Sequence, residues 1–238
     1  MPTADDHVRL STVGANFTRD TRDNPLDEHS GVLESAELDL NSTKLGSSVN
    51  FAKFTGQVAH YHQGFHDIVF ATSLRIGLAQ PYASSRVPLS EEFFTGGGNS
   101  LRGFPLDSAG PQRQVDVCSS GSSTACTKIL VPSGGNELLL INAEARIPLT
   151  IKKGLSLVTF YDGGNVFPRV GFYGFSSSSN NNANNSTADL GLGYKNNVGL
   201  GLRYATPVGP VRIDLGRNLN PVQGINATQY FISIGQAF

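Results

Sequence analysis

The sequence contains no tryptophan, one methionine and two cysteines, and it is poor in charge. Only 39% of its 238 residues are hydrophobic and 16% are charged, whereas 27 are glycine. These proportions disfavour a densely packed helical core. The 18 basic and 19 acidic residues give a formal net charge of -1, so no excess positive charge is available to bind a phosphate backbone. We therefore expect no nucleic-acid partner.

Long hydrophobic runs are also missing. The purest short run is Leu138–Ile141, far below the ~20 apolar residues that a membrane-spanning helix requires, so such helices are excluded. Residues 1–7, which we treat as a separate N-terminal segment, contain Asp5 and Asp6 and lead into no apolar stretch, unlike a secretory signal. We expect that a signal was removed or that the chain is a piece of a longer protein.

The sequence instead shows a period-two alternation of apolar and polar residues, repeated many times. Val198, Leu200 and Leu202, for example, alternate with small or polar residues, as in strands that have two unlike faces. We predict an all-β chain of about nine strands, joined by connections that alternate between short and long. The predicted strands are 8–19, 31–42, 50–63, 67–80, 137–149, 155–167, 194–206, 210–219 and 229–238.

Two architectures combine many antiparallel strands with one apolar and one polar face. A soluble sandwich or barrel turns the apolar face inward, whereas an outer-membrane barrel turns it to lipid and has short periplasmic turns and long outer loops. The long connections 81–136 and 168–193 favour the membrane barrel, and Phe238 resembles a C-terminal sorting signal of bacterial outer-membrane proteins. The less apolar strand faces carry the charged residues Arg75, Glu144, Arg146, Asp162, Arg203, Arg212 and Asp214.

We therefore predict an antiparallel transmembrane β-barrel over residues 8–238, with 81–136 as a long extracellular loop. A complete single-chain bacterial barrel normally has an even number of strands. With nine, we expect a truncated chain, a short natural relative, or a chain that completes its barrel with another copy of itself.

Four motifs follow one another along the chain. They are the turn 20–31, the loop segment Leu101–Phe104 after a run of glycines, the strand segment Phe160–Phe167 and the turn Thr206–Pro210. Together with Phe238, they resemble the C-terminal barrel portion of the BamA/TamA superfamily of outer-membrane assembly and translocation barrels. The resemblance implies a bacterial outer-membrane location, POTRA repeats and a 16-stranded barrel, of which this chain corresponds to the second half.

The resemblance also implies a site inside the barrel. The loop residue Arg102 would fold back into the lumen and meet Asp162 and Glu144, which lie on the inner faces of neighbouring strands. Gly103 would let the backbone approach closely, and Phe104 would pack beside it. The alternative is a solvated Arg102, with both carboxylates lining a wet pore. We call the predicted contact between Arg102 and these two acids the loop latch.

Cys118 and Cys126 flank a stretch rich in serine and glycine, which is poor for zinc but suits a small loop closed by a disulfide. The alternative is two free thiols. For Gly235, the resemblance implies a kink that loosens the barrel seam, and the alternative is a glycine tolerated in a strand that faces the lumen.

Catalytic and metal sites find little support. His60 and His62 share a strand face and His66 follows, but nothing in the pattern completes a metal-ligand set, so we expect no metal. No Gly-x-Ser-x-Gly nucleophile motif occurs, and we expect no enzyme.

The function that the resemblance implies is to help insert or translocate outer-membrane proteins, without a cofactor. An exposed strand edge would pair with an incoming substrate strand. The implied partners are outer-membrane lipid, nascent outer-membrane proteins, and either POTRA repeats from a longer chain or another copy of this chain. The alternative is a small outer-membrane channel or adhesin-like barrel without insertase activity, and a third candidate is an outer-membrane hydrolase.

Overall fold

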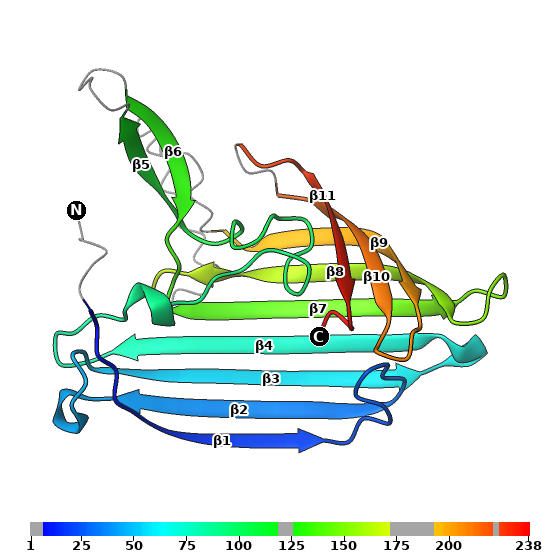
Figure 1. Cartoon of the computed structure of the whole chain (residues 1–238), viewed down its shortest axis with the longest axis horizontal. Helices are drawn as coiled ribbons and strands as arrows, with labels where there is room; N and C mark the ends of the chain where they lie inside the picture. The colour runs from blue at the N-terminus through cyan, green and yellow to red at the C-terminus, as the bar shows by residue number, and fades with distance from the viewer. Residues whose placement is uncertain (1–6, 119–125, 172–192, 221–223) are drawn as a thin grey trace.

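The computed structural model describes residues 7–118, 126–171, 193–220 and 224–238. Its main element is one antiparallel sheet of nine strands in the order β1-β2-β3-β4-β7-β8-β9-β10-β11 (Figure 1). The strands are β1 Thr12–Asp20, β2 Gly31–Asn41, β3 Phe51–Gln63, β4 Val69–Pro81, β7 Glu137–Pro148, β8 Leu155–Phe167, β9 Lys195–Tyr204, β10 Val211–Asn218 and β11 Thr228–Ile234. The predicted all-β, antiparallel, nine-stranded architecture is confirmed.

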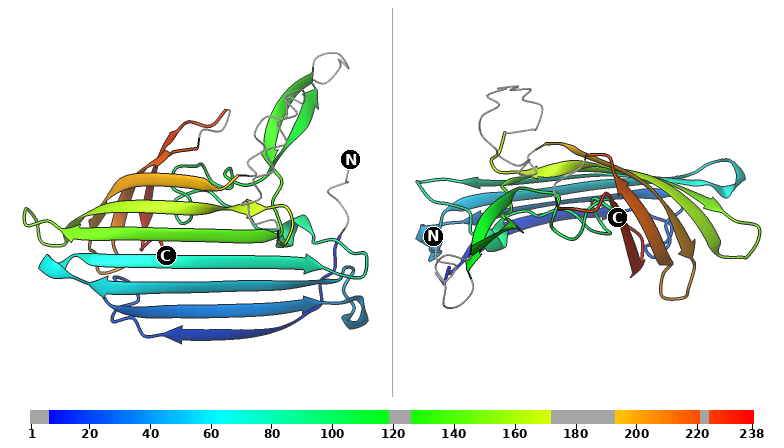
Figure 2. Two further views of the ribbon diagram at one scale, coloured as in Figure 1. Left: turned by 180° about the vertical axis from the view of Figure 1, so that it is seen from behind. Right: turned by 90° about the horizontal axis from the view of Figure 1, so that it is seen from above.

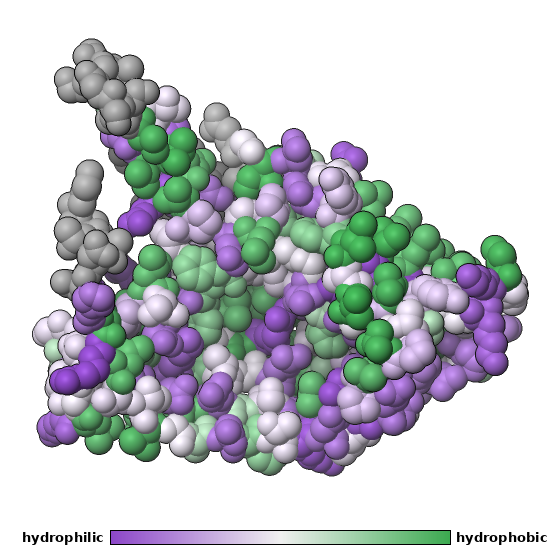
Figure 3. Space-filling model, in the orientation of Figure 1, coloured by the Kyte–Doolittle hydropathy of each residue, from purple (hydrophilic) through white to green (hydrophobic). Residues whose placement is uncertain are grey.

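The sheet is curved, and its two faces differ in chemistry. Strands β10 and β11 curl toward the side on which the long loop lies, which makes that side concave (Figure 2). The register keeps faces matched across strands, since Leu215 pairs with both Leu200 and Tyr230, and all three are exposed on the convex face. Hydrophilic, neutral and moderately hydrophobic residues are mixed in the hollow on the concave face, onto which Figure 3 looks. This arrangement suits a wall with lipid outside and a polar lumen inside.

Two strand ends differ from their predicted positions by roughly 4 residues, the limit to which a sequence pattern defines strand boundaries. The first strand begins at Thr12 and not at residue 8. The last ends at Ile234, because Gly235 takes a φ of 94°, a left-handed conformation that breaks the extended strand. The sequence had indicated that Phe238 ends an alternating strand. In the structure the strand stops before Phe238.

The connections differ at the two ends of the sheet, as Figure 1 shows. The connections 21–30, 64–68, 149–154 and 205–210 lie at one end, and the two longest, which follow β4 and β8, lie at the other. The loop after β4 has structure that the sequence analysis missed. It contains the 3-10 helix η3 (Leu89–Glu91) and a separate hairpin of β5 (Gln112–Cys118) and β6 (Cys126–Pro132). The alternation in these strands is too short to stand out beside the Ser/Gly-rich run.

Within the described ranges, β1 pairs only with β2 and β11 pairs only with β10, so each leaves one strand edge unpaired. None of the helices in these ranges is long and apolar enough to cross a membrane.

Candidate functional site

The site is built on residues 96–104 of the loop after β4, which fold back on themselves. Gly96 and Gly97 have φ values of 120° and 98°, a backbone conformation that residues other than glycine rarely adopt. The Gly97 amide donates to the carbonyl oxygen of Phe104 at 3.0 Å, and the Phe104 amide donates to that of Leu101 at 3.0 Å. The result is a compact tip that presents Arg102 to the concave face of the sheet.

Two glycines allow this tip to lie directly on the strands. A Cβ at Gly216 of β10 would lie 2.0 Å from the main-chain oxygen of Arg102, and one at Gly103 would lie 2.5 Å from Oδ1 of Asn197. Leu101 and Phe104 are fully buried and pack against Leu140. The loop backbone and the wall are therefore in van der Waals contact, with no room for water between them at these points.

Arg102 contacts both acids that the sequence analysis named. Its Nε and Nη2 donate to Asp162 Oδ2 and Oδ1 at 2.8 and 2.6 Å, its amide donates to Asp162 Oδ2 at 3.1 Å, and its Nη1 donates to Glu144 Oε1. The guanidinium also lies 3.5 Å from the ring centroid of Phe160. Arg102 is 1% exposed and Asp162 is fully buried. The pairing of Arg102 with Asp162 is bidentate, so it fixes the orientation of the guanidinium as well as compensating its charge.

The site extends beyond the predicted residues along the neighbouring strands. Asn142 donates to Asp162 Oδ1 at 2.8 Å and to the carbonyl oxygen of Ser100 at 2.7 Å, so it ties the loop to the same carboxylate. Arg203 pairs with Asp214 and, at 3.4 Å, with Glu144 Oε1. Alternation had assigned Arg203 and Asp214 to the inner face. That Arg203 also reaches Glu144, on a strand that is not its neighbour, could not be read from one strand at a time.

The network also reaches the turn 21–30. Arg146 donates through Nε to Glu144 Oε2 at 3.0 Å, and its Nη1 lies 3.5 Å from Glu28 Oε2. Glu28 is 2% exposed and accepts from Arg22 Nη1 at 2.7 Å. A chain of charges therefore connects the loop with the opposite end of the sheet. Nothing in the sequence marked Glu28, because it lies in a turn and meets a residue 118 positions away.

Burial and pairing act in opposite directions on these groups. Burial alone would lower the pKa of the Arg102 guanidinium, but its hydrogen bond to Asp162 and the charge of Glu144 raise that pKa above its ordinary value. Arg102 therefore stays charged. The arrangement fixes a loop by charge pairing, and breaking one partner of such a buried pair costs more than the pair itself contributes.

The other predicted residues lie outside this cluster. Cys118 and Cys126 face each other in the register of β5 and β6, and the side chain of Cys118 is outside the described residues, so the disulfide stays a prediction. Gly235 stands at the bend after β11, as described above.

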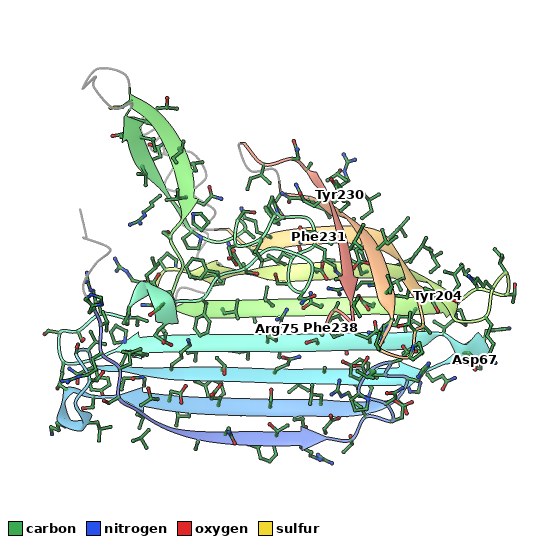
Figure 4. All side chains as sticks on the ribbon, in the orientation of Figure 1. Asp67, Arg75, Tyr204, Tyr230, Phe231 and Phe238 are labelled. Atoms are coloured by element: carbon green, nitrogen blue, oxygen red, sulfur yellow. The ribbon has the colours of Figure 1, made fainter. Side chains whose placement is uncertain are left out.

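After Gly235 the chain turns onto the concave face. The Phe238 ring stacks on Tyr61 of β3 with centroids 6.5 Å apart, and Tyr61 Oη donates to the Phe238 main-chain oxygen at 2.7 Å. Figure 4 labels Phe238 in front of the sheet. Gln236 donates to Asp27 Oδ1 at 2.9 Å, which adds a second tie to the turn 21–30.

The histidines do not gather. His60 and His62 are exposed on the convex face of β3, and His66 lies in the following turn. Across the part of the chain that the structure describes, no three His, Cys, Asp or Glu side chains are grouped to hold a metal.

Comparison with known proteins gives a family match over almost the whole chain. The Omp85 superfamily domain matches residues 2–238. The outer membrane protein assembly factor BamA of Nitratidesulfovibrio vulgaris is 25% identical over 232 residues, which is 96% of this chain and 26% of that protein. Sorting and assembly machinery component 50 homologs of Bos taurus and Homo sapiens are 28% and 27% identical over 110 residues, 46% of this chain and 23% of theirs. The chain thus spans about a quarter of these relatives.

A solved structure shares the fold. The crystal structure of BamA from Haemophilus ducreyi lacking POTRA domains 1-3 superposes with a TM-score of 0.69 and 19% sequence identity, covering 92% of this chain and 41% of that one. The curved nine-stranded sheet is therefore a fold already seen as part of a larger β-protein.

Proposed function

The chain belongs to the Omp85 superfamily, and from this membership we propose that it forms part of a non-enzymatic outer-membrane barrel that helps to insert or translocate other outer-membrane proteins. The observation that carries the proposal is the family match over residues 2–238, because it includes the strands and the loop together. The relatives named as assembly factors support the same role.

The protein is an outer-membrane protein. That this is the bacterial outer membrane is the finer part of the proposal. It is supported by the BamA relative, which matches 96% of the chain, whereas the sorting and assembly relatives match 46%.

The structure supplies a physical route for the proposed activity. Strand β11 has only seven residues, and its outer edge is unpaired among the described residues. Free N–H and C=O groups along such an edge can pair with an extended strand from another protein. The bend at Gly235 ends this edge, which limits the number of residues that can pair with an incoming strand. The proposed partners are nascent outer-membrane proteins, lipid, and POTRA repeats of a longer chain or a second copy of this chain.

The latched loop gives the edge a firm support. Loop residues 98 and 99 contact Arg212 of β10, the strand that carries β11. An incoming strand would thus meet an edge whose neighbour is held from the inside. A simple channel does not need this support, and the loop occupies part of the lumen face that a channel would leave open.

The test uses the chain refolded into lipid vesicles. A small, urea-unfolded outer-membrane barrel protein is added, and its folding is followed by the heat-dependent shift of its band on a gel. Vesicles with the chain should fold the substrate faster than empty vesicles and faster than vesicles with an unrelated outer-membrane barrel. Equal rates in all three vesicle types, together with ion conductance from the chain alone, would support the channel and overturn the proposal.

A further inference from the structure

A pocket lies on the concave side, between the loop tip and the curled end of the sheet. Its volume is about 360 Å³, and its lining includes Arg75 of β4, Arg212 of β10, Phe231 of β11 and the loop residues Gly98 and Asn99. Figure 4 labels Arg75 and Phe231, which come from strands well separated in the sheet. None of these residues belongs to the loop latch.

Arg212, which lines this pocket, has one donor without an acceptor. It is 1% exposed, and its Nη2 donates to the carbonyl oxygen of Gly98 at 2.9 Å and to Oδ1 of Asn99, while its Nε donates to Ser233 Oγ. Its Nη1 is buried and has no acceptor among the described residues. A buried N–H of a charged group without an acceptor is costly, and such groups ordinarily find a partner.

Arg75 approaches the same loop residue from the other side. Its Nη2 donates to the main-chain oxygen of Asn99, and its buried Nε also lacks an acceptor within the described part of the chain. Both guanidinium groups therefore donate to one residue, Asn99, Arg75 to its main-chain oxygen and Arg212 to its side-chain Oδ1.

No carboxylate among the described residues accepts a hydrogen bond from Arg75 or Arg212. Arg75 makes no ion pair there, and the acid near Arg212 is Asp214, whose Oδ2 is 3.9 Å from Arg212 Nε. Asp214 already pairs with Arg203 and lies 3.9 Å from Arg102. The contacts that Arg75 and Arg212 do make are to carbonyl, amide and hydroxyl oxygens, which accept hydrogen bonds but carry no charge.

We propose that this pocket binds a phosphate group between Arg75 and Arg212, a site beyond the assembly function proposed above. A tetrahedral oxyanion has acceptor oxygens on several sides, so one group can accept from Arg212 Nη1 and from Arg75 Nε together. Ser100 and Ser233 line the same pocket with hydroxyl groups. The bound phosphate would connect β4 and β10 through the loop tip. Its source is either free phosphate or the headgroup of an anionic phospholipid.

The test measures binding of inorganic phosphate to the refolded chain in neutral detergent, by isothermal titration at constant ionic strength. The variants are Arg75→Gln, Arg212→Gln and the double variant, and Arg113→Gln on the exposed β5 strand is the matched control. Each single variant should weaken phosphate binding by about tenfold or more, because a charged hydrogen-bonding partner is lost. Arg212→Lys, which keeps the charge but not the planar fork, should fall between Arg212→Gln and the parent.

The proposal is overturned if the parent shows no saturable binding, or if the pocket variants bind phosphate as the parent and Arg113→Gln do. Strand circular dichroism checks the fold of each variant. If Arg212→Gln does not fold, Arg75→Gln alone decides, since Arg75 makes a single hydrogen bond to the loop.

Lipid nanodiscs distinguish the two sources. Phosphatidylglycerol discs should lower the apparent affinity for inorganic phosphate relative to phosphatidylcholine discs if the headgroup occupies the pocket. Equal affinity in both kinds of disc, with the same loss in the arginine variants, identifies free phosphate as the ligand. Both outcomes support the site.

Discussion

The concave face has two unlike halves. On β7 to β10 the loop covers it, and the sheet's buried charged side chains in the described part of the chain all come from these four strands. On β1 to β4 the face carries neutral polar groups such as Asn16 and Gln57 beside charged residues such as Glu37 and Lys53, which are exposed or half-buried, and it borders a cavity of about 520 Å³. Fully buried charge is therefore concentrated where the loop removes it from water.

The difference indicates the role of the buried charged side chains. The charged groups of the open half, such as Glu37 and Lys53, remain in contact with water. Buried ones, by contrast, are tolerated only when they are paired and hydrogen-bonded, and they then fix one arrangement. The covered half is thus built to hold a loop in place, and the open half is built to stay hydrated.

Removing the latch arginine should have the largest effect on this contrast. Arg102→Ala leaves Glu144 and Asp162 buried without Arg102, which costs about 3 to 5 kcal/mol for a dry pair and less where water enters. The loop should detach, while the convex wall stays folded. The measurement is chymotrypsin cleavage after Phe94 and Leu101 in the folded protein, since Pro105 blocks cleavage after Phe104.

Asp162→Asn should expose the same sites, and the double variant should add little, because both changes break one shared contact. Arg113→Ala on the exposed hairpin is the control. If both single variants are as protected as the parent, Arg102 does not hold the loop.

Adding one methyl group to each half, by a glycine-to-alanine substitution, should have the next largest effect on stability and only in the covered half. Gly216→Ala puts a Cβ 2.0 Å from the main-chain oxygen of Arg102, so the loop has to move, at a cost of about 1 to 3 kcal/mol. Gly14→Ala, in the open half, meets the tip of the Asp39 side chain at 2.2 Å, which can swing aside. We expect about 0.5 kcal/mol or less there. Unfolding by urea in detergent measures both, and equal losses would contradict the division into two halves.

Loss of one hydrogen bond at the chain end should have a smaller effect. Tyr61→Phe removes the bond to the Phe238 main-chain oxygen but keeps the stacked ring, so we expect a loss of about 0.5 to 1.5 kcal/mol. Carboxypeptidase should release the C-terminal residues faster. The matched control is Tyr82→Phe, which removes a 2.8 Å bond to the Asn41 carbonyl far from the chain end and should leave carboxypeptidase release unchanged.

The smallest effect concerns pH and the turn 21–30. Burial raises the pKa of the Glu28 carboxyl above its ordinary value, in spite of the opposing charges of Arg146 and Arg22. The folded state therefore binds the Glu28 proton more tightly than the unfolded state. The contribution of Glu28 to stability is present below its ordinary pKa and is lost as the pH rises through its raised pKa.

Stability measured across this pH range should accordingly fall less steeply with rising pH in Glu28→Gln than in the parent. Glu34→Gln, on a half-exposed carboxylate of the convex face, serves as the control. Identical pH profiles for Glu28→Gln and the parent would show that Glu28 does not couple the turn to pH.

Much of the covered half could be predicted from the sequence. Alternation placed Glu144, Asp162 and Arg203 on one face, and the Leu101–Phe104 motif supplied the loop partner. The hairpin of β5 and β6 could not be predicted, because its alternation is short and interrupted by a Ser/Gly-rich run. Glu28 could not be found either, since its partner Arg146 lies on a strand 118 residues away.

The sequence by itself determined the wall, because the period-two pattern decides which face each side chain takes whatever the strand pairs with. It also determined where the strands lie, to within a few residues. Only the tertiary structure decided what meets inside the wall. The curvature of the sheet, the fold-back of the loop and the left-handed turn at Gly235 bring together groups that are remote in sequence, and none of these contacts has a local signature.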